Sequence, residues 1–143
     1  MTSALVADTG GLIHALSRTP SGDAAFPEFE DALSSASAII VPGLVLAEVD
    51  YFWRKQRQAM RQLLAEIFDQ GSRYEYEAPT PADIVRAMEI DAKFVALELG
   101  LVDGMVAAVA ERRRIYRVLT SDRRDFGAVR VGRRFSQALD LVP

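Results

Sequence analysis

Residues 4–11 of the chain read Ala-Leu-Val-Ala-Asp-Thr-Gly-Gly, and this stretch decides the fold. Its four apolar residues predict a short buried strand, and the Asp-Thr-Gly-Gly segment predicts a turn where that strand ends. A carboxylate beside so much apolar structure is costly unless it is paired, hydrogen-bonded or bound to a metal. Asp8 is therefore the first candidate for a functional residue.

Strand-like and helix-like segments alternate along the rest of the chain. Further strands are expected over residues 38–41, 74–77, 117–120 and 129–131. Helices are expected over residues 12–16, 26–36, 44–70 with a break near 55–58, 80 or 81 to 98, and 103 to 110. Such alternation predicts an α/β fold, with a parallel sheet flanked by helices on both faces. With 143 residues, the size suits one domain spanning residues 1–143.

The composition excludes several classes of site. The chain has no cysteine, which rules out disulfides, zinc-thiolate centres and cysteine nucleophiles. It contains neither a Walker-type phosphate loop nor a Gly-x-Ser-x-Gly nucleophile elbow. The first residues lack the pattern of a signal peptide, and no apolar run approaches the ~20 residues that span a bilayer. We expect a soluble, cytoplasmic protein with no membrane partner.

Charge is distributed unevenly along the chain. Residues 111–143 contain nine arginines and four acids, a balance of 9 − 4 = +5. The net charge of the whole chain is −3, so the remainder carries −3 − 5 = −8. An arginine-rich region of this kind predicts contact with an anionic partner through its phosphate or carboxylate groups, although a solvated surface explains it equally well.

Three further acids also close or interrupt strongly apolar segments: Glu48, Asp103 and Asp122. Asp122 follows a predicted strand, as Asp8 does. Asp103 lies at a predicted helix start, and Glu48 lies in a helix that follows a strand. Ligands of open parallel sheets bind outside the carboxyl ends of the strands. We therefore expect all four acids to converge at one edge of the sheet.

A divalent cation is the simplest reason to gather so many acids. Mg2+ takes oxygen ligands and binds through a few carboxylates together with substrate phosphates. Phosphodiester hydrolysis needs an activated water and neutralised charge at phosphorus, and metal ions, often two about 4 Å apart, supply both. The expected ligands are Asp8 and Asp103 first, then Glu48 and Asp122 directly or through water, with Asp125 as a weaker fifth candidate.

Each acid also has an ordinary interpretation. Asp8 and Asp103 suit the N-cap position of a helix, a frequent use of aspartate. Glu48 would be an exposed helix residue, although no cation stands four positions away to pair with it. Asp122 would be a turn residue. The only histidine, His14, is expected in packing or at the surface rather than in catalysis.

Two smaller groups of residues accompany the acids. Thr120 and Ser121 directly precede Asp122, and either hydroxyl is placed to donate to a carboxylate or to a scissile phosphate. Residues 51–53 read Tyr-Phe-Trp within a predicted helix. Because consecutive helical residues point in different directions, at least one of these rings is expected to be exposed or at an interface.

Taken in order, these residues resemble the PIN domain and, more narrowly, the VapC toxins of bacterial toxin–antitoxin pairs. The matching motifs are Asp8-Thr9, Ala47-Glu48 after Val41-Pro42, Leu101-Val102-Asp103, and Leu119-Thr120-Ser121-Asp122-Arg123-Arg124-Asp125-Phe126. They run from residue 8 to residue 126, and the Thr-x-Asp-x-x-Asp-Phe ending is the most specific. One departure is Gly104, where the family more often has alanine, a mild change expected to loosen the helix start.

The resemblance implies a PIN-like three-layer fold in a single domain, with an acidic pocket for Mg2+ or Mn2+. Asp8, Glu48, Asp103 and Asp122 would take the four acidic positions, with Asp125 as a rival to Asp122. The implied activity is endoribonuclease cleavage, commonly of tRNA or ribosomal RNA, by a homodimer that a VapB-type antitoxin blocks. Two alternatives are a receiver-like domain that accepts a phosphoryl group and a PIN-like binding module without catalytic activity.

Overall fold

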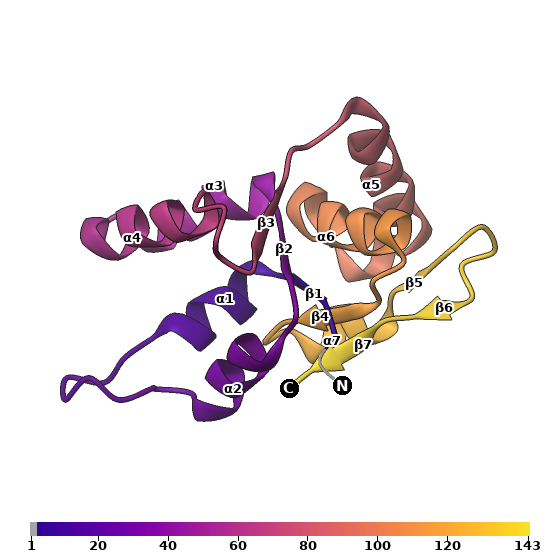
Figure 1. Ribbon diagram of the computed structural model, residues 1–143. Coiled ribbons are helices and arrows are strands. Elements are labelled where there is room, and N and C mark those ends of the chain that lie inside the picture. The colour runs from indigo at the N-terminus through magenta and orange to yellow at the C-terminus, as the bar shows by residue number, and fades with distance from the viewer. Residues whose placement is uncertain (1–2) are drawn as a thin grey trace.

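The computed structural model describes residues 3–143, and its centre is a sheet of five parallel strands in the order β3-β2-β1-β4-β7 (Figure 1). The strands are β1 (Leu5–Ala7), β2 (Ile39–Pro42), β3 (Tyr74–Glu77), β4 (Arg117–Leu119) and β7 (Asp140–Val142). The helices are α1 (Thr9–Leu16), α2 (Pro27–Ser35), α3 (Gly43–Phe52), α4 (Arg57–Ile67), α5 (Pro81–Lys93), α6 (Gly100–Arg113) and α7 (Arg123–Ala128).

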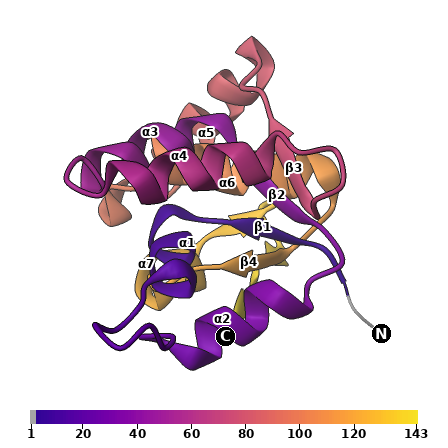
Figure 2. The ribbon, with the colours of Figure 1, turned by 60° about the vertical axis from the view of Figure 1, so that its left-hand side comes forward.

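The central strand is β1, which lies between β2 and β4. Val6 pairs with Ile40 on one side and with Val118 on the other. Every residue of β1 and β2 is buried, as the apolar runs predict. Helices α5 and α6 lie on one side of the sheet, and α2 and α7 lie on the other (Figures 1 and 2). The predicted α/β fold, with a parallel sheet between two layers of helices, is confirmed.

The last part of the chain departs from the prediction. The strand expected over residues 129–131 is β5 (Arg130–Val131), which pairs with β6 (Gln137–Ala138) in a separate antiparallel ribbon. The fifth strand of the main sheet is instead β7, where Leu141 pairs with Val118. Strand β7 was not predicted, because its three residues, one polar and two apolar, are too few to show a strand pattern.

Helix boundaries differ in two places that affect the acids. The helix expected to reach residue 98 ends at Lys93, and a short 3-10 turn (Val95–Leu97) follows. As a result α6 starts at Gly100, and Asp103 lies within its first turn rather than at its start. The short helix α7 was not predicted. Within residues 3–143, no helix is long and apolar enough to cross a membrane.

Gly104 lies where α6 packs against α5. A Cβ atom at this position would lie 2.7 Å from the carbonyl oxygen of Ala87 and 3.1 Å from its Cβ. The glycine, expected only to loosen the helix start, therefore also lets the two helices approach closely beside Asp103.

Gly11 marks a tighter approach, between the first turn of α1 and the end of β4. A Cβ atom there would lie 2.1 Å from the carbonyl oxygen of Leu119 and 2.5 Å from its carbonyl carbon. Since backbone cannot move aside as a flexible side chain does, we expect Gly11→Ala to lower the free energy of unfolding by about 2 kcal/mol or more. Chemical denaturation of the purified variant measures this change.

Gly127→Ala is the matched control, because a Cβ at Gly127 in α7 would meet only a methyl group of Leu141, at an ordinary 3.8 Å. This variant should be neutral or more stable, since alanine favours a helix by up to about 1 kcal/mol. Equal stability of the two variants would contradict the close packing of α1 on β4.

Candidate functional site

The topology places the four predicted acids around one recess. Asp8 follows β1 and Asp122 lies three residues beyond the end of β4, so both stand at the carboxyl edge of adjacent strands. Glu48 projects from α3, and Asp103 projects from the first turn of α6. All four line a cavity of about 330 Å³, together with Thr9, Gly10, Ile13, His14, Phe52 and Ser121.

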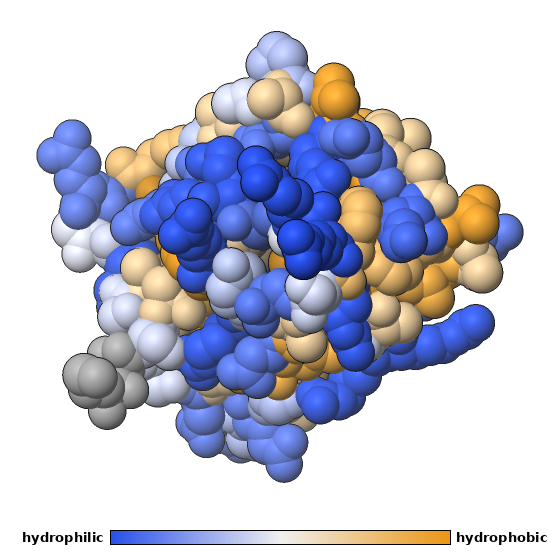
Figure 3. Space-filling model, turned by 90° about the vertical axis from the view of Figure 1, so that its right-hand side faces the viewer, coloured by the Kyte–Doolittle hydropathy of each residue, from blue (hydrophilic) through white to orange (hydrophobic). Residues whose placement is uncertain are grey.

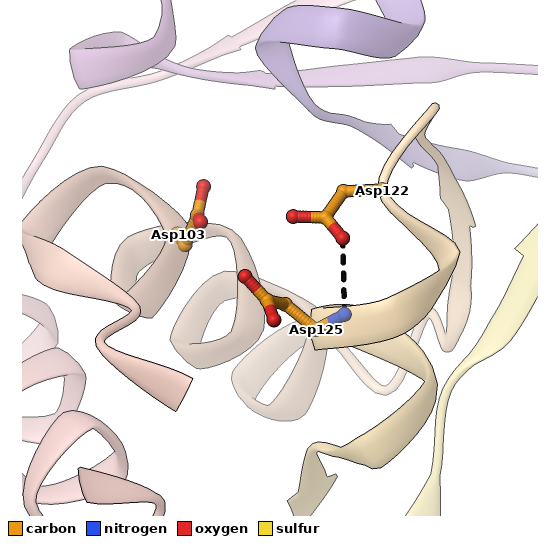
Figure 4. A group of neighbouring side chains, drawn as sticks. All are labelled: Asp103, Asp122 and Asp125. Atoms are coloured by element: carbon orange, nitrogen blue, oxygen red, sulfur yellow. Dashed lines mark hydrogen bonds between the residues drawn. The ribbon is translucent and has the colours of Figure 1, made fainter. Parts of the chain in front are cut away.

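Asp125 joins this group more closely than the sequence suggested. One carboxylate oxygen from each of Asp103, Asp122 and Asp125 lies within 4.8 Å of the other two (Figure 4). The reason is the unpredicted helix α7, which begins directly after Asp122 and turns Asp125 back toward α6. The backbone N–H of Asp125 donates to Oδ1 of Asp122 at 3.0 Å. Asp122 therefore caps α7 and faces Asp103 at the same time.

Thr120 connects Asp8, which follows β1, with Asp122, which follows β4. Its hydroxyl donates to Oδ2 of Asp8 at 2.8 Å and accepts the backbone N–H of Asp122 at 2.9 Å. Thr120 is 1% exposed, so these bonds are shielded from bulk solvent. The prediction that a hydroxyl here donates to a carboxylate is confirmed for Thr120.

Burial and the neighbouring charges raise the pKa values of three of the acids. Burial raises the pKa of Asp8 to about 6, and the charges of Glu48 and Asp122 add to the effect, while the bond from Thr120 opposes it. Burial likewise raises the pKa of Asp103 to about 7, with further increases from the neighbouring carboxylates. The pKa of Asp125 is also raised, by desolvation and by Asp122. Among residues 3–143, no lysine or arginine lines the recess to offset this repulsion.

The structure rejects two ordinary interpretations and supports a third. Asp8 occupies the N-cap position of α1, but its side chain makes no capping hydrogen bond. Asp103 is not a cap either, because the N-cap of α6 is Leu99. His14 packs as expected: its ring lies 4.2 Å from that of Phe26, and Nδ1 lies 2.9 Å from the carbonyl oxygen of Gly10.

The donor set of the recess suits a hard divalent cation. Its polar side chains offer carboxylate and hydroxyl oxygens, with no thiol or thioether, and the only nitrogen ligand, His14, is engaged in packing. The hydroxyl of Thr9 is buried and has no partner within residues 3–143. Oxygen-rich, negatively charged sites of this kind favour Mg2+ or Mn2+ over softer metals.

The arginine-rich region is less available than its sequence suggested. Arg112 donates to both carboxylate oxygens of Asp83, at 2.9 and 3.0 Å, and Arg113 donates to Glu75 at 2.9 Å. Both arginines also bond to Glu77. They fasten α6 to α5 and β3, and these ion pairs compete with any contact between this pair and RNA phosphates. These ion pairs were not predicted, because Glu75 and Glu77 of β3 lie 35 to 38 positions earlier in the chain.

Other arginines of the region remain exposed. Four of them are exposed and form neither an ion pair nor a side-chain hydrogen bond within residues 3–143: Arg114, Arg124, Arg133 and Arg134. Figure 3 shows the side of the molecule that carries α5, α6 and the β5–β6 ribbon, where hydrophilic side chains cover much of the surface. These four arginines therefore remain available to an anionic partner.

Comparison with known proteins agrees with this geometry. Residues 5–132 match the family model of the PIN domain. The chain belongs to the PIN-domain family. This PIN domain is 32% identical over 128 residues to Ribonuclease VapC26 of Mycobacterium tuberculosis, and the match covers 88% of the chain and 92% of that protein. The resemblance to VapC-type ribonucleases inferred from the motifs is thereby confirmed.

A solved structure shares the fold of this PIN domain. The crystal structure of VapC20 of Mycobacterium tuberculosis, described as a sarcin-ricin loop cleaving toxin, superposes with a TM-score of 0.71 at 20% identity. The match covers 87% of this chain and 94% of VapC20. At that level of identity the likeness supports the three-layer architecture, while the family assignment rests on the sequence matches.

Proposed function

We propose that this PIN domain is a metal-dependent endoribonuclease toxin that hydrolyses a phosphodiester bond in structured RNA of the tRNA or ribosomal RNA class. The observation that carries the proposal is the convergence of five carboxylates at one recess, which no lysine or arginine of residues 3–143 lines. Three of the five, Asp8, Asp103 and Asp125, have raised pKa values. The name of VapC26 and the description of VapC20 both refer to proteins that act on RNA, which supports the substrate class.

The residues proposed to hold Mg2+ or Mn2+ are Asp8, Glu48, Asp103 and Asp122, with Asp125 as a fifth ligand. When bound, such an ion neutralises charge on the phosphate and lowers the pKa of a water molecule. The protein contributes the arrangement of the acids. Thr120 fixes Asp8 relative to the loop that carries Asp122, and the capping bond at the start of α7 fixes Asp125 relative to Asp122. Preorganised ligands of this kind need no rearrangement when the substrate arrives.

The same proposal includes partners. Because its relatives are VapC proteins, we propose that a VapB-type antitoxin neutralises this PIN domain, that it forms a homodimer, and that it acts in the cytoplasm on RNA. An antitoxin arginine reaching the acids would form charge-assisted hydrogen bonds in the position of the cation. The exposed arginines that are free of ion pairs are proposed to contact RNA phosphates. Membership of the PIN family sets aside the receiver-like alternative, and the inactive binding module is the remaining rival.

Incubation of the purified protein with total tRNA and with ribosomal RNA tests the proposal. We expect discrete cleavage products with Mg2+ or Mn2+ and none after EDTA, because the crowded acids cannot stabilise an anionic phosphate without a cation. Sequencing of the RNA ends identifies the bond that is cut. A protein that binds either ion, as judged by calorimetry, and yet cleaves neither RNA would support the binding-module alternative.

A further inference from the structure

Two aromatic rings at the end of α3 are unusually exposed. Tyr51 and Phe52 are 61% and 58% exposed, whereas Trp53, the third member of the run, is partly buried against the core. The sequence predicted that at least one of the three would be exposed, and the structure confirms this for two. Large exposed aromatic groups that lie side by side mark binding surfaces more often than chance placement.

Phe52 belongs to the same recess as the acids. It follows Glu48 by four positions, so the two side chains stand on one face of α3, about 6 Å apart along its axis. Both line the cavity that also holds Asp8, Asp103 and Asp122. An RNA phosphate that reaches these carboxylates therefore enters a cavity that Phe52 also lines.

The surroundings of Phe52 hold this surface in place. The rings of Tyr51 and Phe52 meet edge to face, 5.6 Å apart at an angle of 80°. The guanidinium of Arg54 lies over the Tyr51 ring at 4.3 Å and donates to the Tyr51 carbonyl oxygen at 3.0 Å. We call Tyr51, Phe52 and Arg54 the aromatic shelf. The shelf offers ring faces and a planar cation, and it carries no carboxylate.

We propose that the aromatic shelf binds an unpaired nucleobase adjacent to the bond that is cleaved, with the base stacked on Phe52. The inference rests on the proposed ribonuclease function and adds a base-binding position to it. Proteins that recognise single-stranded RNA splay bases out and stack them on aromatic side chains or arginine planes. Such stacking tolerates any base, because every base presents a ring face. The shelf would therefore select unpaired segments of a structured RNA and position the scissile phosphate over the acids.

The test is a cycle that combines a protein variant with an RNA variant. Phe52→Leu keeps apolar volume but removes the ring face, and an abasic ribonucleotide beside the cleaved bond removes the base. We expect either change alone to lower kcat/KM by roughly 5- to 150-fold, mainly through KM, because one stacked base contributes about that factor. The two changes combined should cost no more than one, since each removes the same contact. Phe52→Trp should retain activity.

Phe68→Leu is the matched control. Phe68 is 61% exposed and contacts another aromatic ring, that of Tyr76 at 5.3 Å, but it does not line the acidic recess. This variant should cleave both RNAs as the unmodified protein does. The proposal would be overturned if the Phe52→Leu change and the abasic ribonucleotide lowered kcat/KM by factors that multiply when the two are combined. It would also be overturned if the Phe52→Leu protein cleaved RNA normally. Normal cleavage with an altered elution volume in size-exclusion chromatography would assign the shelf to a protein interface instead.

A binding experiment separates failure of the shelf from failure of the ribonuclease function. A short single-stranded RNA carrying one 2-aminopurine reports stacking by fluorescence quenching and requires no cleavage. Quenching that Phe52→Leu abolishes and Phe68→Leu preserves supports the shelf even if no RNA is cut. Absence of quenching in a protein that does cleave RNA would reject the shelf and leave the ribonuclease function intact.

Discussion

We expect Asp103→Asn to lower the rate of RNA cleavage by at least about 100-fold, the scale of losing one group that stabilises charge in a preorganised site. Asp103 is the central acid of the recess: its carboxyl group feels the charges of Asp8, Glu48, Asp122 and Asp125. In the cluster of Asp103, Asp122 and Asp125, it is the one acid that comes from α6, while the other two come from the segment that begins α7. Single-turnover cleavage of an RNA identified with the unmodified protein measures the loss.

The same variant should be more stable than the unmodified protein when no metal is present. Asparagine has nearly the shape of aspartate but cannot carry the charge that its four acidic neighbours oppose. The matched control is Asp31→Asn, which changes an exposed acid on α2 far from the recess and should alter neither cleavage nor melting temperature. Loss of activity together with a lower melting temperature would indicate a structural role for Asp103 and contradict the assignment as a ligand.

The metal-free protein should become less stable as the pH rises from 5 to 8. The pKa values of Asp8 and Asp103 lie at about 6 and about 7 in the folded protein, above the ordinary value of 3.8. The folded state therefore retains protons that the unfolded state has already released, and the free energy of unfolding falls as pH rises through these values. We expect a change on the order of 2 kcal/mol after solvent screening, or roughly 5 °C in melting temperature.

Millimolar Mg2+ should reverse this trend. Ligand carboxylates must lose their protons before they bind a cation, so the ion should raise the melting temperature more at pH 8 than at pH 5. Thermal unfolding at both pH values, with Mg2+ and with EDTA, measures the effect. In Asp103→Asn, the melting temperature should change less with pH and rise less with Mg2+. Asp31→Asn should match the unmodified protein in both respects. An equal rise at pH 5 and pH 8 would show that the bound ion does not compete with protons at these acids.

The sequence was sufficient to predict the parallel sheet and the convergence of the acids. Asp8 and Asp122 follow apolar strands, and the ends of adjacent parallel strands meet at one edge whatever the details of the loops. Glu48 and Asp103 were harder to place, because the direction of a side chain on a helix depends on where that helix starts. In the structure α6 starts at Gly100, three residues before the predicted start, and Asp103 nevertheless lines the recess.

The features that the sequence did not predict depend on contacts between distant segments. Asp125 ranked below Asp122 because nothing local indicated that α7 would turn it toward Asp103. The pairing of Arg112 and Arg113 with acids of β3 and α5 likewise joins residues far apart in the chain, so charge counting overestimated the basic surface. Phe52 was singled out only as one of three aromatic residues, since its position beside the acids depends on the geometry of α3.

The edge strand β7 has a consequence for the order in which the protein matures on the ribosome. The backbone N–H of Thr120, whose hydroxyl positions Asp8, donates to the carbonyl oxygen of Val142 at 3.2 Å. That bond, and the pairing of β4 with β7, must wait until residue 142 has left the exit tunnel. A nascent chain that has already exposed all five acids thus still lacks one support of the acidic recess, which takes its final form only after β7 has paired with β4.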